Sequence, residues 1–378
     1  MDATWTVLGG IGASRAWIDA GDNPTVSREF LGALETSGAV RAETGWQPLH
    51  LACEGQVFVP LYVKGHSYGE YVFDHAWAHA ARRAGIRYYP KLLTAVPFTP
   101  TAGRRLLAPA GADLPALAGE ALQLVQELAR QNALSSWHVL FPHDSEIEAW
   151  RGTGMLHRFG VQYHWFNRGY GDFDDFLGRF RQSRRKTVRR ERRLVAEQGI
   201  TLQTLEGDQI EPHHWRVFCE CYRATYRKRS GHDGYLNEQF FRTIGERMPR
   251  NIVMVLAVHQ GRHVAAALCL RSHDTLYGRY WGALQEFDSL HFEACYYQGI
   301  EYCLRHGLRR FDPGAQGEHK IPRGFEPILT HSFHWIAHPG LADAVAEYLE
   351  SERRDIEEYV RAAREWLPFH RGAGDSPQ

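Results

Sequence analysis

The order of hydrophobic and polar positions in the first half of the chain predicts short strands around two helices. Runs of aromatic and β-branched residues, typical of strands, cover residues 57–63, 70–73, 86–94, 137–141 and 159–166. Between them, Asp74 is the expected N-cap of a helix that ends at Gly85. Residues 114–132 carry leucines at helical spacing and predict a second helix.

The second half begins with a long amphipathic pattern. Asp172 is the expected N-cap of a basic helix over residues 173–197, whose apolar side chains recur at helical spacing before Gly199. The other expected helices cover residues 213–229, 237–247, 293–305 and 341–366, and the expected strands cover residues 252–258, 264–271 and 276–281. Strands and helices that alternate in this way indicate an α/β fold with mixed sheets.

The length of the chain, 378 residues, suggests two domains. An internal similarity favours a duplication, because Tyr68-Gly-Glu-Tyr71 and Tyr277-Gly-Arg-Tyr280 each precede a helix that ends at a glycine. The expected division is a first lobe over residues 1–165, a second lobe over residues 166–370 and a flexible tail over residues 371–378.

Composition narrows the class of protein. The formal net charge is zero, with 44 basic and 44 acidic side chains, so any attraction to nucleic acid or to an anionic membrane has to be local. The six cysteines form no C-x-x-C pair, which favours reduced, buried thiols. No stretch approaches the roughly 18 apolar residues of a membrane span, and no secretory leader is evident, so a cytoplasmic protein is expected.

Residues 312–327 form the segment with the richest chemistry, and they are too many for a simple turn. The segment combines glycines with an acid, an imidazole and two cations: Gly314, Gly317, Gly324, Glu318, His319, Lys320 and Arg323. Glycines let the backbone approach a ligand, and Lys or Arg can hold phosphate or carboxylate groups. A functional loop is one interpretation. A solvated surface loop with mutually paired charges is the other.

Two smaller polar groups are candidates for the same chemistry. The first consists of Arg279, Tyr280, His291 and Glu293. These side chains would line a pocket shared with the glycine-rich segment, unless they belong only to a half-buried strand and an aromatic helix. The second group, in the first half, consists of Lys64, His66 and Glu70, for which a hairpin turn is the alternative.

A basic run lies within the expected helix over residues 173–197. Residues 181–193 contain seven arginines and Lys186 against one acid, Glu191. Such a run is commonly a solvated helix face. Arg185, Lys186 and Arg189 could equally attract the phosphates of a tRNA, a nucleotide sugar or coenzyme A. No zinc-ligand spacing, nucleophile elbow, P-loop or G-x-G-x-x-G motif is present, so no metal is expected.

Eleven stretches, taken together, carry a resemblance to a known family: residues 64–74, 88–92, 97–100, 162–167, 185–186, 189–192, 276–282, 290–293, 295–297, 314–320 and 323–324. With them the sequence resembles the FemAB-like family of the GNAT acyltransferase superfamily, labelled peptidoglycan biosynthesis/recognition. The resemblance implies two tandem GNAT-like lobes and transfer of an acyl or aminoacyl group to an amine. Its implied donors are acyl-CoA or aminoacyl-tRNA, and its implied acceptors include cell-wall precursors.

One feature departs from the GNAT pattern. The pyrophosphate-binding signature, Gln or Arg followed by x-x-G-x-G or A, is matched only in part by Arg82-x-x-Gly85-x-Arg87. This weakens acyl-CoA as the donor without establishing tRNA.

The chemistry of the transfer assigns roles to the candidate residues. Glu318 or His319 is the candidate base, Lys320 and Arg323 would bind phosphate or a developing oxyanion, and Tyr280 could donate to the leaving group. Glu293 completes the candidate catalytic group. Substrate would be held by Lys64, His66, Glu70, Arg185, Lys186, Arg189, Arg279, His291, Gly314 and Gly317.

Two other functions fit the same residues. A GNAT scaffold could bind a phosphate-bearing or peptidoglycan-related ligand without catalysis. A tRNA- or RNA-binding module centred on residues 181–193 would bind with strong salt dependence. The donor, the acceptor, the pathway and the oligomeric state are left open by the sequence.

Overall fold

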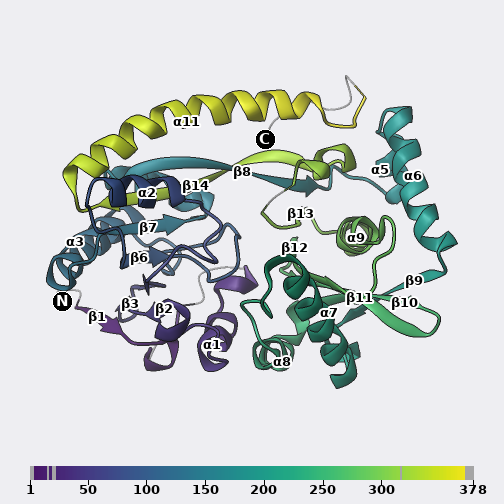
Figure 1. The fold of residues 1–378 in the computed structure, drawn as a ribbon, viewed down its shortest axis with the longest axis horizontal. Coiled ribbons are helices and arrows are strands. Elements are labelled where there is room, and N and C mark those ends of the chain that lie inside the picture. The colour runs from purple at the N-terminus through teal and green to yellow at the C-terminus, as the bar shows by residue number, and fades with distance from the viewer. Residues whose placement is uncertain (1–3, 15–16, 19–22, 316, 371–378) are drawn as a thin grey trace. The chain divides into compact units, whose positions relative to one another are not determined.

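The computed structural model describes residues 4–14, 17–18, 23–315 and 317–370, so the expected tail over residues 371–378 lies outside the described part (Figure 1). The chain forms two compact units. The first consists of residues 1–161 and 329–358, and the second of residues 162–328 and 359–378. Residues 329–358 therefore group with the first unit, whereas the sequence pattern placed them in the second lobe.

The first unit is built on a mixed sheet with strand order β2-β5-β6-β7-β14, beside a small sheet of order β1-β3-β4. Its strands are β1 (Trp5–Leu8), β2 (Trp46–Pro48), β3 (His50–Cys53), β4 (Val57–Val59), β5 (Tyr62–Lys64), β6 (Lys91–Thr94) and β7 (Ser136–Leu140). Its helices are α1 (Arg28–Thr36), α2 (His75–Arg83), α3 (Leu114–Asn132) and α4 (Ile147–Gly152). Three elements continue from one unit into the other: β8 (Leu156–Phe166), β14 (Glu326–Ile336) and α11 (Pro339–Glu365).

Burial of apolar side chains explains why these elements assemble. The apolar stripe of α3 packs on Trp137 and Val139 of β7, together with Trp150 of α4. Trp77 of α2 packs in a second cluster with Ile336, Leu341, Val345 and Leu349. These contacts join residues 329–358 to the first unit, and β14 also pairs with β7 in antiparallel register.

The second unit has strand order β8-β13-β12-β11-β10-β9. Its strands are β9 (Ile200–Glu206), β10 (Ile252–His259), β11 (Arg262–Arg271), β12 (Thr275–Ala283) and β13 (Arg310–Asp312). Its helices are α5 (Phe173–Gly178), α6 (Gln182–Glu197), α7 (Pro212–Ser230), α8 (Glu238–Arg247), α9 (Leu290–Phe292) and α10 (Gln298–His306), with a π-helical turn, η7 (Glu293–Tyr297), between the last two. A 3₁₀ segment, η8 (Glu318–Arg323), follows β13.

The predicted meander of three strands is confirmed in β10, β11 and β12. Gln260 and Gly261, the two residues between β10 and β11, both have positive φ, which is the geometry of a tight type I′ hairpin turn. Helix α7 packs along this meander, with Phe218 and Tyr222 fully buried against Phe241 of α8. The α/β class with mixed sheets is therefore confirmed.

Among the described residues, a parallel strand pair joined by a helical crossover is found in each unit. In the first unit β6 runs parallel to β7 through α3, and in the second β12 runs parallel to β13 through the helix that starts at α9. This correspondence supports two tandem lobes of one kind. The internal similarity read from the sequence joined the wrong segments, because residues 68–71 form a loop whereas residues 277–280 lie in β12.

The predicted strand over residues 86–94 is shorter in the structure, where β6 covers only Lys91–Thr94. Three other predicted elements differ for identifiable reasons. Residues 70–73 are irregular because Gly69 and Tyr71 have positive φ, which breaks a strand. Residues 57–63 divide into β4 and β5 on either side of Pro60. The basic helix over residues 173–197 is interrupted at Phe180, where the chain instead bridges to Phe369 and Arg181 donates its backbone N–H to the Pro368 carbonyl.

In the described part of the chain, none of the helices is both long enough and apolar enough to cross a bilayer.

Candidate functional site

The candidate site of the second unit is organised by a β-bulge in β12. A register shift against β11 leaves Arg279, between Gly278 and Tyr280, as the extra residue. The parallel pairing of β12 with β13 ends one step earlier, at Tyr277 and Asp312. The bulge therefore aims a guanidinium at the end of β13, where the glycine-rich segment begins.

Arg279 and Asp312 form an ion pair that is removed from solvent. The Arg279 Nη1 lies 3.2 Å from Asp312 Oδ1, Nη2 contacts Oδ2, and both side chains are 2% exposed. Burial alone would raise the pKa of Asp312, but Arg279 and His164 lower it, so the pKa lies below its usual range. Asp312 also accepts a hydrogen bond from the Gly314 N–H. It is thus a charged anchor for the segment.

Lys320, like Asp312, holds the glycine-rich segment through Gly314. Its side chain is buried, and its ammonium donates to the Gly314 carbonyl at 2.7 Å. Gly314 adopts φ +95°, a left-handed conformation that favours glycine. Burial lowers the pKa of Lys320 to about 8, with Asp312 opposing that shift. A buried ammonium aimed at a backbone carbonyl holds the segment in place, which is a positioning role.

Arg323 secures the other end of η8. Its guanidinium donates to Glu191 of α6 at 2.7 Å, to the Tyr297 hydroxyl at 3.0 Å and to the His319 carbonyl. It also lies over the ring of Phe292. Lys320 and Arg323 therefore point inward and fix the backbone around His319.

His319 faces outward from that fixed backbone. Its Nε2 lies 2.8 Å from the Tyr296 hydroxyl, and its ring lies near those of His291 and Phe292. Gly317 makes room for the imidazole, because a Cβ on Gly317 would come within 2.2 Å of the His319 ring. Burial, and then the charges of Lys320 and Arg323, lower the pKa of His319, so its imidazole is neutral near pH 7.

The centre of the His291 ring lies 6.3 Å from that of His319, and Glu318 directly precedes His319 in the chain. Burial, and then His319, lower the pKa of His291 to about 4. Glu318 is exposed and accepts a hydrogen bond of 2.7 Å from Tyr359, whose hydroxyl also contacts Tyr163. Eight sequence-predicted residues thus come together in the second unit: Arg279, His291, Gly314, Gly317, Glu318, His319, Lys320 and Arg323.

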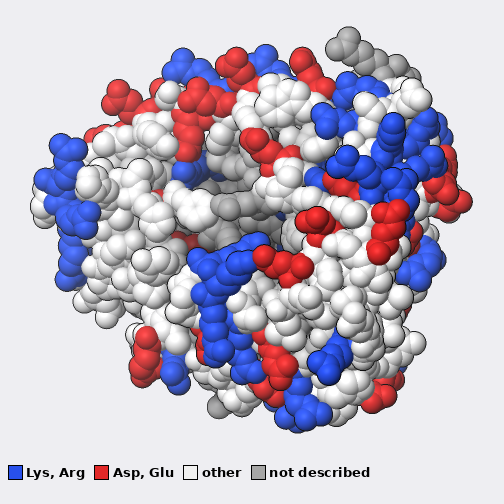
Figure 2. Space-filling model, turned by 45° about the vertical axis from the view of Figure 1, so that its right-hand side comes forward, with Lys and Arg blue, Asp and Glu red and all other residues white. Residues whose placement is uncertain are grey.

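The other predicted residues of the second unit lie elsewhere. Glu293 is buried and pairs with Arg192 through two hydrogen bonds of 3.0 Å, in the wall of a cavity of about 500 Å³ that Arg189 also lines. Tyr280 is buried between Tyr222 and Phe241. The cations of α6 gather on the surface, where Figure 2 shows a basic patch; Lys186 is exposed and Arg185 is half-buried.

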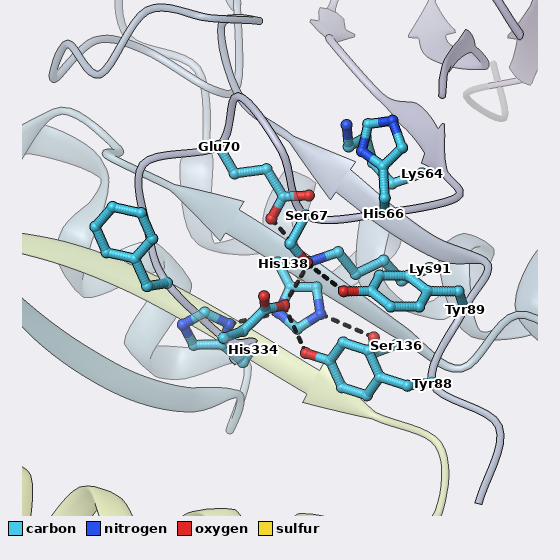
Figure 3. A network of polar contacts seen from close by, with 12 residues as sticks. Lys64, His66, Ser67, Glu70, Tyr88, Tyr89, Lys91, Ser136, His138 and His334 are labelled. Carbon is cyan, nitrogen blue, oxygen red and sulfur yellow. Dashed lines mark hydrogen bonds and ion pairs between the residues drawn. The ribbon is translucent and has the colours of Figure 1, made fainter. Parts of the chain in front are cut away.

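In the first unit, a second polar cluster surrounds Lys91, which the sequence pattern did not single out. The Lys91 ammonium is fully buried and donates to Ser67 at 2.9 Å, to Glu70 at 2.8 Å and to Asp74 (Figure 3). Each of its three N–H bonds therefore has an acceptor. Glu70 Oε1 and Asp74 Oδ1 are buried without a hydrogen-bond partner among the described residues.

Of the predicted residues Lys64, Glu70 and His66, Glu70 bonds to Lys91, whereas Lys64 and His66 have other partners. Burial lowers the pKa of Lys64 to about 7, with Glu70 opposing the shift, and the Lys64 ammonium lies 3.6 Å from the centre of the Trp46 ring. Burial raises the pKa of Glu70 to about 7 against the charge of Lys91. His66 instead contacts the Thr44 carbonyl at 3.2 Å and receives the Tyr68 N–H, so it stabilises the loop rather than the cluster.

Behind Lys91, two imidazoles face each other across β7 and β14. His138 and His334 are direct register partners, and their Nδ1 atoms lie 2.6 Å apart. Each Nε2 meets a serine hydroxyl at 2.8 Å, Ser136 and Ser332 respectively. Burial lowers the pKa of His138 to about 3 and that of His334 well below its usual value. The pair is therefore neutral.

A family model described as FemAB-like, peptidoglycan biosynthesis/recognition, matches residues 2–371. The chain belongs to the FemAB-like family. The resemblance read from the sequence is thereby confirmed, and acyl or aminoacyl transfer is the enzyme class that accompanies it. No curated protein sequence matches the chain.

Three solved structures are similar to this FemAB-like chain, and the first of them supports its fold. The C-terminal domain of a putative lysylphosphatidylglycerol synthetase from Agrobacterium fabrum matches with a TM-score of 0.52 and 11% identity, over 88% of this chain and 93% of that one. L-PGS from Bacillus licheniformis matches with a TM-score of 0.49 and 9% identity, over 84% and 95%. FemX matches with a TM-score of 0.48 and 12% identity, over 82% and 93%.

The partial pyrophosphate signature of this FemAB-like protein is not a strand-to-helix phosphate loop. Arg82 lies in the last turn of α2, and Gly85 follows the end of that helix with φ +70°. A helix end of this polarity presents carbonyl oxygens rather than N–H groups, so its backbone does not cradle phosphate.

Residues that the sequence pattern missed are those defined by distant partners. They are Asp312, Tyr296 and Lys91. All three lie within segments named in the sequence analysis, but their role in the site becomes clear from their contacts in the structure. A charged residue inside an otherwise apolar strand was the available signal for Lys91, since β6 reads Lys-Leu-Leu-Thr and is buried throughout. The six thiols are free, as expected.

Proposed function

We propose that this FemAB-like protein transfers an acyl or aminoacyl group from an activated ester or thioester to an amine. The observation that carries the proposal is the outward-facing His319, held on a backbone that Lys320 and Arg323 fix from within. The family and the fold of the Agrobacterium fabrum domain, described as a putative lysylphosphatidylglycerol synthetase, support transfer of this kind.

His319 is the proposed general base. The tautomer that serves this role donates Nε2–H to the Tyr296 oxygen and leaves the lone pair of Nδ1 available. In the step, the amine nitrogen attacks the carbonyl carbon and the N–C bond forms. The proton of the amine moves to His319, and the bond from the carbonyl carbon to the leaving oxygen or sulfur breaks. The same imidazolium can return its proton to that leaving group.

Tyr296 positions the imidazole, and Lys320 positions the segment that bears it. Burial raises the pKa of Tyr296 above its usual value, so the phenol stays neutral and keeps its hydrogen bond at physiological pH. Neither residue needs to reach the reacting atoms. Glu318, the residue before His319, accepts a hydrogen bond from Tyr359 and would orient the amine as an ammonium before it loses its proton.

The experiment is a transfer assay on the purified full chain. Acyl-CoA thioesters and aminoacyl-tRNAs are offered with amine acceptors, including cell-wall precursors, and amide products are detected by mass spectrometry. His319→Gln is expected to lower kcat by about 10²–10⁴-fold, the usual contribution of a general base. His213→Gln, which removes a half-buried imidazole of α7, is the matched control and is expected to leave kcat unchanged. Full turnover by His319→Gln would contradict the assignment.

The transfer assay, combined with melting temperatures measured with each donor and acceptor, separates catalysis from ligand binding alone. A donor or acceptor that raises the melting temperature but gives no amide product would favour a GNAT-scaffold binding protein.

A further inference from the structure

The chain folds back sharply between α5 and α6. Asp174 and Arg189 would have their Cα atoms about 22 Å apart in one straight helix. Instead, Arg189 Nη2 lies 2.9 Å from Asp174 Oδ1. The guanidinium of Arg192 likewise lies over the ring of Phe173, 4.5 Å from its centre. Helix α6 is therefore turned back against α5.

The local sequence does not explain this turn. Residues 179–182 include neither glycine nor proline, the usual causes of a helix break, and Gly178 is still helical. The freed backbone groups are bonded to the C-terminal segment: Arg181 donates its N–H to the Pro368 carbonyl at 2.8 Å, and the Arg179 carbonyl accepts the His370 N–H at 3.0 Å. Residues 367–370, called the strap below, replace the bonds of a continuous helix.

Side chains of the strap also cover the turn. The half-buried ring of Phe369 lies 5.3 Å from that of Phe180 and 6.4 Å from that of Phe176, both of which are fully buried. The Leu367 carbonyl accepts a further hydrogen bond from the Arg181 guanidinium. The strap thus supplies both hydrogen bonds and apolar contact, so it stabilises the turn.

The turn in turn contacts the segment that carries His319. Gly324, which directly follows η8, packs against two rings of the turn. A Cβ on Gly324 would lie 2.7 Å from the Phe176 ring and 3.0 Å from the Phe180 ring. Gly324 has φ +88°, a conformation that favours glycine. The end of η8 is therefore fitted directly against the aromatic side chains that the strap covers.

Glu191 provides a second connection. It is the one acid among residues 181–193, and it accepts hydrogen bonds from Arg323 Nη2 at 2.7 Å and from the Tyr297 hydroxyl. Arg323 donates in turn to the His319 carbonyl. Because α6 begins at the turn, the turn determines where Glu191 meets Arg323.

We propose that the strap is a positioning element for His319. It fixes the turn between α5 and α6, and the turn fixes the end of η8 through Gly324 and Glu191. The expected effect on turnover rests on the proposed function. The expected effect on the order of residues 318–324 does not depend on which reaction the protein catalyses.

Hydrogen exchange of the full chain, measured by peptide mass spectrometry, tests the connection without a substrate. In Phe369→Ala the amides of residues 318–324 are expected to exchange about tenfold faster or more, because the turn loses its aromatic cover. The hairpin of β10 and β11 is the internal reference and should be unchanged. Phe369→Leu keeps an apolar side chain and should recover most of the protection. Unchanged exchange in residues 318–324, or equal acceleration in the hairpin, overturns the proposal.

Glu191→Gln tests the second connection and leaves the strap intact, so it decides the matter even if Phe369→Ala does not fold. Glu197→Gln is the matched control, since it removes the same charge from the same helix at an exposed pair with Arg193. Faster exchange of residues 318–324 is expected only in Glu191→Gln. Equal effects of the two substitutions contradict the connection through Glu191.

Turnover distinguishes this proposal from the proposed function. Phe369→Ala is expected to lower kcat by about ten- to a hundredfold, the effect of a misplaced catalytic group, with little change in KM. Phe369→Leu should restore kcat. A Phe369→Ala protein with faster exchange but full kcat overturns the positioning role. Full turnover by His319→Gln overturns the base instead and leaves the exchange result intact.

Discussion

The Arg279 guanidinium and the Asp312 carboxylate form a buried ion pair that joins the bulge of β12 to the last residue of β13. The two residues are far apart in sequence and meet because the parallel pairing ends at Asp312. From there the chain enters the segment that carries His319. The ion pair therefore determines where the candidate site begins.

Removing one partner of this pair is expected to be strongly destabilising. Arg279→Met leaves Asp312 as a buried, uncompensated charge, and the free energy of unfolding should fall by about 3–5 kcal/mol. The Arg279→Met/Asp312→Asn double variant removes both charges and should be closer to wild type. Urea denaturation of the wild type, of the single variants Arg279→Met and Asp312→Asn, and of the double variant gives the coupling energy. A loss in the double variant that equals the sum of the two single losses would show that the charges do not interact.

Gly317→Ala is expected to impair turnover through His319. The new Cβ would come within 2.2 Å of the imidazole, and φ +121° disfavours any side chain. Because the ring must move, kcat should fall toward the value of His319→Gln, with a loss of stability of about 1–3 kcal/mol. Gly307→Ala is the control, since Gly307 has φ +65° and open space around it. It should lose about 1 kcal/mol of stability and no activity.

Lys91→Met is expected to destabilise the first unit by about 3–5 kcal/mol, because Glu70 and Asp74 would lose their buried cation. Lys64→Met is the comparison. Lys64 is equally buried, but with a pKa of about 7 it is mostly neutral at pH 8 and has no carboxylate within ion-pair distance among the described residues. Its replacement should therefore cost much less at that pH. Denaturant midpoints at pH 8 measure both variants.

The His138–His334 pair predicts a pH dependence of stability. The pKa of His138 falls from 6.5 to about 3 on folding, so below pH 6.5 the unfolded chain binds a proton that the folded chain excludes. The stability contributed by the neutral imidazole is present above pH 6.5 and is lost progressively as the pH falls toward 3, by up to about 1.4 kcal/mol per pH unit for one group. In His138→Gln the slope over this window should be smaller. An unchanged slope would mean that the imidazole is charged in the folded state.

A considerable part of the fold could be predicted from the sequence, because its signals are local. The apolar runs of β10, β11 and β12 and the Gln260-Gly261 turn between β10 and β11 specify a meander through neighbouring residues alone. The length and amphipathic pattern of α11 likewise predict a helix. The family resemblance rested on short contiguous segments, which are recognised from the order of their residues alone, so the family too could be predicted.

The interruption of the basic helix could not be predicted from the sequence in this way. Its apolar pattern continues through Phe180, but the chain breaks there because Phe369, nearly two hundred residues later, offers a bridge and an aromatic contact. Local periodicity contains no information about such a partner.

The same distinction holds for the candidate site. The sequence by itself determined that glycines, an imidazole and cations are concentrated in residues 312–327, and this was enough to name His319 and Lys320. Only the tertiary structure decided that Lys320 and Arg323 point inward, that His319 faces outward, and that Lys91 carries a cluster of its own. The physical reason is that a side chain's charge state and direction depend on burial and on partners brought together by strand pairing, neither of which is encoded in its immediate neighbours.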